Sequence, residues 1–219
     1  MGGLVSNLWS LVSPAFWRQK IASWRARRFD RRLGIETRIV VPVVDMHDVE
    51  PTVAAHAVQY EPSTLPKFER AMRAIELDHR TFTFIDFGSG KGRVLMLAAA
   101  YPFRRVIGIE MSAALHSTAS ENVAAFRQRA PGAAPVELVC GDARTLAVPD
   151  GDLLAYFYNP FDETVLRPVW EGLRKVAASG RRRLFVLYVN PACRDVFDSA
   201  TELRCLYDDG AVVAYQWEA

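Results

Sequence analysis

The chain has 219 residues and half of them are hydrophobic, which suits one domain with a well-formed core and an extension. No apolar run reaches the roughly 18 to 20 residues that cross a bilayer, and no basic region opens a secretory signal. The three cysteines lack metal-binding or CxxC spacing, so we expect buried, reduced thiols in a cytoplasmic protein without a metal site.

Basic residues are concentrated near the N-terminus, although the whole chain carries a net charge of only +2. Residues 1–33 contain seven basic residues and one acidic residue. Ser13 and Pro14 are typical of a helix start, and Gly34 is typical of the position after a helix end. Three large apolar side chains would share one face of this helix: Trp17, Ile21 and Trp24. The stripe fits either packing on the domain or contact of residues 13–33 with an anionic surface, such as RNA or the periphery of a membrane.

Strand-like and helical segments alternate through the rest of the chain. Strands are predicted at residues 81–87, 105–110, 136–140, 153–158, 183–189, 203–207 and 211–217, after a short β-prone piece at residues 39–44. Helices are predicted from residues 60–63 through 75, and at residues 94–100, 113–130 and 163–177. The alternation predicts an α/β fold with a parallel sheet, and Asp208-Asp209-Gly210 predicts a terminal hairpin. We expect an extension and linker over residues 1–58 and one domain over residues 59–219.

The most informative segment is a strand that ends in an acid and runs into glycines, Asp86-Phe87-Gly88-Ser89-Gly90-Lys91-Gly92-Arg93. Glycines let backbone approach a ligand closely, and free N–H groups at the following helix start can meet it. A P-loop is excluded because Ile85 and Gly92 stand where it needs Gly and Ser or Thr. A dinucleotide GxGxxG motif is disfavoured because Arg93 stands at its third glycine. An acid followed by GxGxG is instead similar to the S-adenosylmethionine site of class I methyltransferases.

Acids also stand at the ends of the next two predicted strands. Glu110 lies about 20 residues past the glycines, where a carboxylate can accept hydrogen bonds from both ribose hydroxyls. Asp142 can accept from an adenine amino group, with the Ala143 backbone near the ring. Asp86 is placed to organise the amino end of the methionine portion. Each downstream acid has a structural alternative, an exposed strand-end carboxylate for Glu110 and a turn-forming residue for Asp142.

The tip of the fourth strand carries a last motif. Asn159-Pro160-Phe161 resembles the Asn-Pro-Pro-Tyr motif of amino-group methyltransferases, with one Pro missing and Phe in place of Tyr. Together these residues resemble the class I S-adenosylmethionine-dependent methyltransferase family over about residues 60–219. The resemblance implies a Rossmann-like, doubly wound sheet of seven mostly parallel strands with an antiparallel last strand. It implies these cofactor-binding residues: Tyr60, Asp86, Gly88, Ser89, Gly90, Gly92, Glu110, Asp142, Ala143 and Asn159.

By the same resemblance, Asn159, Pro160 and Phe161 would hold the atom that receives the methyl group, and a nitrogen acceptor is expected. A protein lysine, RNA and a small amine all remain open as acceptors, and the Tyr60-x-Pro62 lead-in also resembles that of protein-lysine methyltransferases. The sequence points to no general base. Two other functions stay open, a non-catalytic cofactor- or RNA-binding module and a nicotinamide oxidoreductase. Arg93 and the lack of a substrate-domain His argue against the latter.

Overall fold

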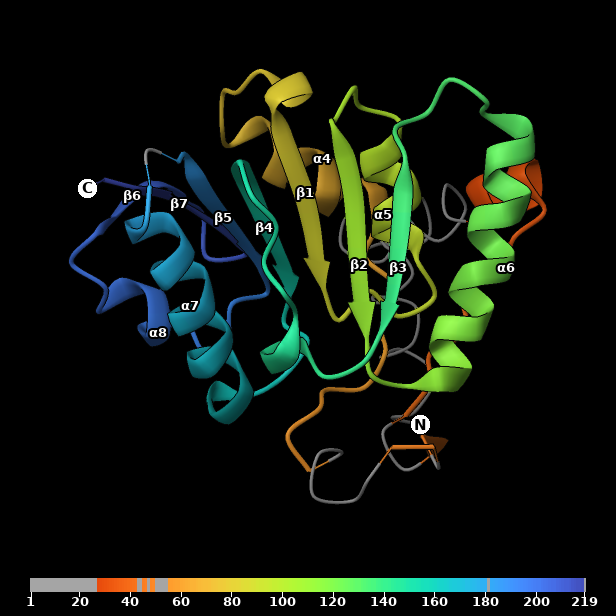
Figure 1. The fold of residues 1–219 in the computed structure, drawn as a ribbon. Helices are drawn as coiled ribbons and strands as arrows, with labels where there is room; N and C mark the ends of the chain where they lie inside the picture. The colour runs from red at the N-terminus through yellow and green to blue at the C-terminus, as the bar shows by residue number, and fades with distance from the viewer. Residues whose placement is uncertain (1–26, 43–44, 47, 50–54, 181, 219) are drawn as a thin grey trace, which may run out of the picture.

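The computed structural model describes residues 27–42, 45–46, 48–49, 55–180 and 182–218. Its strands form one seven-stranded sheet in the order β3-β2-β1-β4-β5-β7-β6 (Figure 1). The strands are β1 Phe82–Phe87, β2 Arg105–Glu110, β3 Val136–Cys140, β4 Asp152–Tyr158, β5 Leu184–Val189, β6 Leu203–Asp208 and β7 Val212–Trp217. The helices are α4 Leu65–Arg73, α5 Arg93–Ala99, α6 Ala113–Arg129, α7 Glu163–Ala178 and α8 Asp195–Asp198, with short 3-10 helices η2 His79–Thr81 and η3 Ala143–Thr145.

The sheet topology confirms the expected fold class. The first five strands in space order are parallel to their neighbours, whereas β7 runs antiparallel to both β5 and β6. The hairpin predicted at residues 208–210 joins these last two strands. Parallel strands that return through helices bring their carboxyl ends to one edge of the sheet, which is where a ligand crevice forms in such folds. In Figure 1 this is the lower edge, where the arrowheads of β1, β2 and β3 point.

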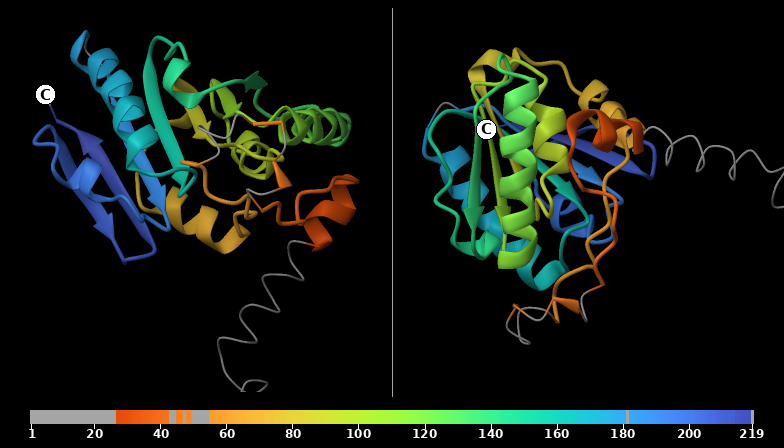
Figure 2. Two further views of the ribbon diagram at one scale, coloured as in Figure 1. Left: turned by 90° about the horizontal axis from the view of Figure 1, so that it is seen from below. Right: turned by 90° about the vertical axis from the view of Figure 1, so that its right-hand side faces the viewer.

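The central strand β1 is buried along its whole length because helices cover both faces of the sheet. Successive side chains point to opposite faces, so Phe82 and Phe84 pack with α4 and α5, and Ile85 and Phe87 pack with α7. The view from below in Figure 2 shows α4 and α7 on opposite sides of the sheet. A doubly covered strand therefore has a nearly continuous apolar sequence. Asp86 is the only charged residue in this strand, and its burial calls for an explanation.

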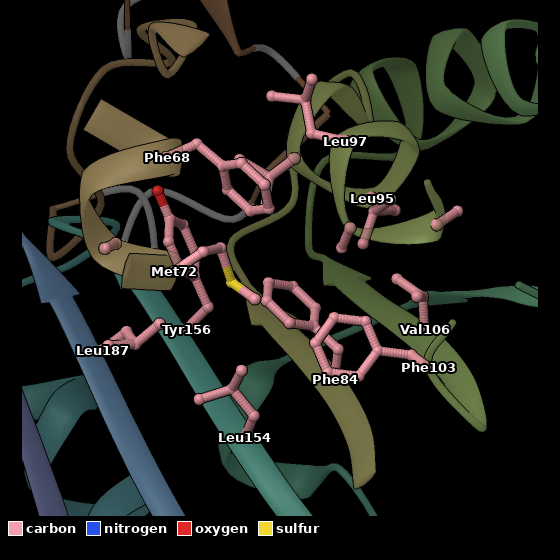
Figure 3. Close-up of a cluster of buried hydrophobic side chains, with 14 of the residues drawn as sticks. Phe68, Met72, Phe84, Leu95, Leu97, Phe103, Val106, Leu154, Tyr156 and Leu187 are labelled. Atoms are coloured by element: carbon pink, nitrogen blue, oxygen red, sulfur yellow. The ribbon is translucent and has the colours of Figure 1, made fainter. Parts of the chain in front are cut away.

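Aromatic packing fixes the neighbouring strands β1 and β4 against α4. Figure 3 shows Phe68 and Met72 of α4 pointing toward Phe84 and Tyr156. The ring centroids of Phe68 and Tyr156 are 5.9 Å apart, and those of Phe84 and Tyr156 are 5.6 Å apart. Aromatic pairs at such distances contribute beyond their buried area. These contacts hold β1 and β4 in place. The glycine segment follows the end of β1, and the Asn159 motif follows the end of β4.

Side-chain caps start the helices that leave this edge of the sheet. The Ser112 hydroxyl accepts a hydrogen bond from the Leu115 N–H at 3.2 Å at the start of α6. The Asp162 carboxylate accepts from the Thr164 N–H at 2.9 Å at the start of α7. Each such cap contributes about 1 kcal/mol. The caps direct both helix N-termini toward the carboxyl ends of the strands.

The described part of the basic N-terminal segment packs on the domain. Residues 27–33 are helical and end as expected at Gly34, whose φ is +63°. The Ile35 N–H donates to the Asp30 carbonyl and the Gly34 N–H to the Arg31 carbonyl, the double closure typical of a glycine-ended helix. Phe29 and its neighbours pack against the core, while the arginines of this turn are exposed. The predicted helix start and its apolar stripe, residues 13–26, lie outside the described residues.

A buried polar network fastens this segment beside the glycine turn. The Arg93 guanidinium donates to the Asp30 carboxylate at 2.9 Å and to the Thr37 hydroxyl at 2.7 Å. The Lys91 ammonium donates to the Glu36 carboxylate at 2.6 Å. Side chains of Arg93 and Asp30 are only 5% and 6% exposed, so the charges depend on each other for solvation. Lys91 and Arg93 therefore connect the glycine motif to the chain upstream of the predicted domain boundary.

Two expectations about smaller features are wrong. Residues 39–42 form no strand, because Val41 makes a single bridge to Tyr60 while Ile39 is 61% exposed. Cys140 and Cys205 are exposed rather than buried, because they end or lie on edge strands, where one side faces solvent. Within the described residues, no helix is both long and apolar enough to span a membrane. No group of His, Cys, Asp and Glu among them could hold a metal ion.

Candidate active site

A cleft opens at the carboxyl edge of the sheet, over the ends of β1, β2 and β4. Its empty space is about 930 Å³, including the mouth to solvent. Ten of the twelve predicted site residues line it: Tyr60, Asp86, Gly88, Ser89, Glu110, Asp142, Ala143, Asn159, Pro160 and Phe161. The structure thus brings together residues spread over one hundred positions of the chain. Gly90 and Gly92 do not line the cleft but shape the turn beneath it.

Asp86 lies at the floor of this cleft with 3% of its surface exposed. No described residue donates a hydrogen bond to its carboxyl group. Burial, together with the nearby charge of Glu110, raises the pKa of Asp86 well above its ordinary value. A buried carboxyl group without a partner is costly unless a ligand supplies a cation or donors. The site is therefore suited to a positively charged group.

Glu110 is fixed to the glycine turn by its own carboxylate. One oxygen accepts from the Gly90 N–H at 2.8 Å, and the other accepts from the Ser112 N–H at 2.9 Å. Burial raises the pKa of Glu110, although these backbone donors favour the charged form. Each carboxylate oxygen can accept more than one hydrogen bond, so Glu110 keeps acceptor sites for a ligand diol. The alternative of an exposed strand-end carboxylate is excluded, because Glu110 is 8% exposed.

Two glycines are required by close contacts as well as by backbone conformation. Gly88 has φ +79°, and a Cβ there would lie 2.4 Å from the Cβ of Pro160. Gly90 has φ +53°, and a Cβ there would lie 2.3 Å from the ring of Tyr60. The turn after β1 therefore touches both the Asn159 motif and the lead-in segment. A side chain at either glycine would displace the residue that it touches, Pro160 or Tyr60.

Tyr60 covers the glycine turn from the solvent side. Its hydroxyl donates to the Thr37 carbonyl at 2.8 Å, and its ring lies beneath the Lys91 ammonium at 5.6 Å from the ring centroid. Burial raises the pKa of this phenol, so it remains protonated. The hydroxyl of Tyr60 is thus held by residue 37, while its ring packs on the glycine turn. Nothing in the sequence pattern indicates this contact with the N-terminal segment.

Asp142 also has the turn role that the sequence left open. Its carboxylate accepts from the Arg144 backbone N–H at 2.9 Å and caps the short helix η3. The Arg144 guanidinium donates to both carboxylate oxygens at 2.9 and 3.0 Å through Nε. The side-chain hydrogen bond from Arg144 holds the pKa of Asp142 below its ordinary value. A ligand amino group would therefore share Asp142 with Arg144, beside Ala143 in the wall of the cleft.

The Asn159 motif forms the opposite end of the cleft. Asn159 has φ +42°, a conformation that Asn tolerates better than most residues. The Tyr188 hydroxyl donates to its side-chain oxygen at a long 3.4 Å. The Val58 N–H donates to the Pro160 carbonyl at 3.1 Å, and Ala57 bridges Phe161. A segment about one hundred residues upstream in sequence thus holds the motif in place.

Sequence reasoning missed one ionisable pair at this end. The His56 Nδ1 and the Asp162 carboxylate are 2.8 Å apart, and His56 lines the cleft. The pair joins residues 106 positions apart, so spacing within the sequence gives no signal for it. Apolar side chains from three other segments complete the wall: Met46, Met111 and Leu115. In the sequence, each of them looks like any other hydrophobic residue, so nothing marks it as part of a site.

The chemistry of the lining fits S-adenosylmethionine. The buried Asp86 carboxyl lacks a partner, as an ammonium or sulfonium site would require. The Ser89 hydroxyl is likewise buried and without a hydrogen-bond partner among the described residues. At Gly88 and Gly90 a Cβ would fill space beside the turn. Glu110 and Asp142 offer acceptors for hydroxyl and amino groups farther along the cleft.

Comparisons with known proteins agree with this chemistry. Residues 84–180 match the protein family described as "Methyltransferase domain". No curated protein has a significant sequence match to the chain. A solved protein of Methanococcus maripaludis, described as a candidate S-adenosyl-L-methionine-dependent methyltransferase, is 15% identical with a TM-score of 0.51 over 70% of this chain and 86% of that chain. Precorrin 8w decarboxylase of Methanobacterium thermoautotrophicum is 20% identical with a TM-score of 0.51 over 73% of this chain and 92% of that chain.

At these identities the structural likeness shows the fold, and the family match covers the segment that holds Asp86, Glu110 and Asn159. The glycine turn, the strand-end acids and the sheet with its antiparallel β7 all belong to the same pattern. Residues 84–180 therefore match a methyltransferase domain within a fold that the two solved proteins share, and the lining of the cleft fits S-adenosylmethionine.

Proposed function

We propose that this methyltransferase transfers the methyl group of S-adenosylmethionine to an amine nitrogen. The observation that carries the proposal is the position of Asn159-Pro160-Phe161 in the wall of the cleft that Asp86 and Glu110 also line. Asn159 supplies a side-chain oxygen and the backbone supplies carbonyl groups, which together suit the N–H groups of an amine. Carbonyl acceptors would orient the nitrogen lone pair toward the methyl carbon.

The residues of the glycine end bind and orient the cofactor. Asp86 would receive the ammonium of the methionine portion, and Glu110 would accept the ribose hydroxyls. Asp142 and the Ala143 backbone would meet the adenine portion, and Tyr60 would cover the turn. When bound, S-adenosylmethionine supplies a methyl group on a sulfonium, whose thioether is a good leaving group. The protein's contribution is mainly alignment and exclusion of water.

The charges of the lining support a cationic acceptor. Four acids line the cleft: Glu61, Asp86, Glu110 and Asp142. The Arg93 guanidinium also lines it, but its hydrogen bonds go to Asp30 and Thr37. An anionic acceptor would meet repulsion here, whereas a protonated amine would be attracted. A lysine side chain or a small alkylamine therefore fits the cleft better than a phosphate-rich segment.

The proposal has a direct test in two steps. Calorimetric titration with S-adenosylmethionine, its demethylated product and NADH should give micromolar binding of the first two alone. Transfer of radiolabelled methyl should then be measured to n-butylamine, poly-L-lysine, lysine-containing peptides and RNA. Labelling of amines supports the proposal. Binding without labelling of any amine contradicts it, and binding of NADH alone would move the protein to redox chemistry.

The exposed arginines of residues 27–33 support a second, weaker contact. Arg31 and Arg32 are exposed on a helical turn that Phe29 and Asp30 anchor to the domain. We propose that this turn helps to hold the protein at an anionic surface near the cleft. Such attraction depends on charge and is screened by salt. It would raise the local concentration of an acceptor without contributing to the transfer itself.

A further inference from the structure

The strongest unassigned feature is the pair formed by His56 and Asp162. The imidazole Nδ1 lies 2.8 Å from the Asp162 carboxylate, with side chains 35% and 46% exposed. No described residue is hydrogen-bonded to the other ring nitrogen, Nε2. A carboxylate at Nδ1 fixes the tautomer with its proton on Nδ1, which leaves Nε2 as a proton acceptor. The pair thus has the arrangement of an oriented base.

The backbone places this base next to the acceptor motif. The Asp162 N–H donates to the His56 carbonyl at 2.9 Å, and the Val58 N–H donates to the Pro160 carbonyl at 3.1 Å. These bonds align residues 56–58 antiparallel to residues 160–162, with His56 in the wall of the cleft. His56 therefore stands beside the Asn159-Pro160-Phe161 motif. Its position is set by main-chain atoms and does not depend on its own side chain.

The other ionisable groups of the lining are already occupied or misplaced. Glu110 is bonded to two backbone N–H groups, and Asp142 to Arg144. Asp86 is buried at the floor of the cleft, where a bound cofactor's positive charge would keep it ionised. His56 is the only histidine in the lining. It is thus the one imidazole of the described lining, and its Nε2 is the ring nitrogen left to accept a proton there.

We propose that His56, oriented by Asp162, is the general base that deprotonates the acceptor amine. This inference rests on the proposed function. The ammonium N–H bond breaks and its proton passes to His56 Nε2, so a neutral amine and an imidazolium result. The nitrogen lone pair then forms the bond to the methyl carbon, while the carbon–sulfur bond breaks and its electron pair stays on sulfur. The partly exposed imidazolium releases its proton to solvent.

The charges around the pair favour this order of events. Asp162 stabilises the imidazolium, and Glu163 adds a second acid in the first turn of α7. Burial, with the charges of Asp162 and Glu163, raises the pKa of the nearby Cys193 thiol, which therefore stays neutral. Burial by itself would raise the pKa of Asp162, but the hydrogen bond from His56 lowers this pKa and keeps the carboxylate ionised. The positive charge of a bound cofactor's sulfonium, next to the methyl group to be transferred, would disfavour a second positive charge on the amine and assist its deprotonation.

The test is a pH–rate profile with n-butylamine or poly-L-lysine, whichever is labelled. His56→Gln keeps the backbone bonds and should lower kcat by about 10²- to 10⁴-fold. Asp162→Asn keeps a helix-capping side chain and should lower kcat less, since it only orients the base. The acidic limb of the wild-type profile, caused by protonation of His56, should disappear in His56→Gln. Imidazole added to His56→Ala should restore part of the lost rate.

Matched measurements separate this inference from the proposed function. His116→Gln changes a histidine on α6 that does not line the cleft, and should leave kcat unchanged. Calorimetric affinity for S-adenosylmethionine should be the same in all variants, because neither His56, Asp162 nor His116 is among the residues assigned to the cofactor. Amine labelling with an unchanged rate and pH profile in His56→Gln would overturn the role of His56. Absence of amine labelling in the wild type, with the cofactor bound, would instead overturn the acceptor assignment and this inference with it.

Discussion

The two ends of the cleft are held in place by different means. At the glycine end, Asp86 and Glu110 are buried, and the Arg93–Asp30 pair behind them is almost fully shielded from solvent. At the acceptor end, the His56–Asp162 pair is one-third to one-half exposed and is positioned by backbone bonds. A buried pair is strongly coupled to folding, whereas an exposed pair contributes little to stability. The glycine end is thus built for rigidity and the acceptor end for exchange of protons with solvent.

The largest effect should come from breaking the buried pair. Asp30→Ala leaves the Arg93 guanidinium buried without its carboxylate, and should lower the free energy of unfolding by about 3 to 5 kcal/mol. Asp162→Asn should change it by about 1 kcal/mol or less, because that pair is exposed. Urea denaturation of both variants measures the difference. Equal losses of unfolding free energy would show that the Arg93–Asp30 pair is no more strongly coupled to folding than the His56–Asp162 pair.

The next effect should come from crowding the contact between the glycine turn and the Asn159 motif. Gly88→Ala places a Cβ 2.4 Å from the Cβ of Pro160 at a positive φ, and should cost about 1 to 3 kcal/mol in stability. The affinity for S-adenosylmethionine and the transfer rate should both fall, since the change moves the glycine turn and the acceptor motif. Gly132→Ala is the matched control because its Cβ meets nothing within 4 Å. Thermal unfolding and calorimetry check the pair, and similar results for both variants would contradict the close contact.

Asp86→Asn should weaken cofactor binding but raise the stability of the ligand-free protein at neutral pH. Loss of the charged partner should weaken S-adenosylmethionine binding by about 10- to 100-fold, as for a hydrogen bond to a charged group. Burial and the Glu110 charge raise the pKa of Asp86 above its ordinary value of 3.8, so the folded state binds its proton more tightly than the unfolded chain. The ligand-free wild type should therefore lose stability as the pH rises from 3.8 through the raised pKa.

The variant removes the Asp86 part of this pH dependence, so it should gain stability relative to the wild type at neutral pH. Denaturation between pH 4 and 8, with and without S-adenosylmethionine, measures the change. Saturating cofactor should flatten the wild-type dependence, because its positive charge favours the ionised carboxylate. A variant that binds as tightly as the wild type would remove Asp86 from the cofactor site.

The smallest effect concerns the exposed arginines. Arg31→Gln with Arg32→Gln should weaken binding to RNA or anionic vesicles modestly and reduce its salt dependence. Calorimetric affinity for S-adenosylmethionine should not change, because neither residue lines the cleft. Binding to one of the two surfaces identifies which anion is contacted. Unchanged binding to both would leave this turn without the proposed role.

The sequence determined the fold to within one or two residues at most strand ends. Strands β2 and β3 occupy the predicted residues, and β1 and β5 begin one residue later than predicted. Apolar runs bounded by turn residues carry this information because both faces of the sheet are covered. The glycine turn and Glu110 were also readable, since a ligand needs small residues and a strand-end acid at fixed spacing.

Only the tertiary structure decided how the site is enclosed and which groups remain available in it. Lys91 and Arg93 are ordinary basic residues in sequence, yet they fasten residues 30–37 beside the turn. The β-prone residues 39–42 pair only at Val41, because their partner is the lead-in segment and not the sheet. His56 and Asp162 meet across 106 residues. Local sequence patterns carry information on secondary-structure propensity and motif spacing. The pairing and burial of side chains that are distant in sequence depend on tertiary packing.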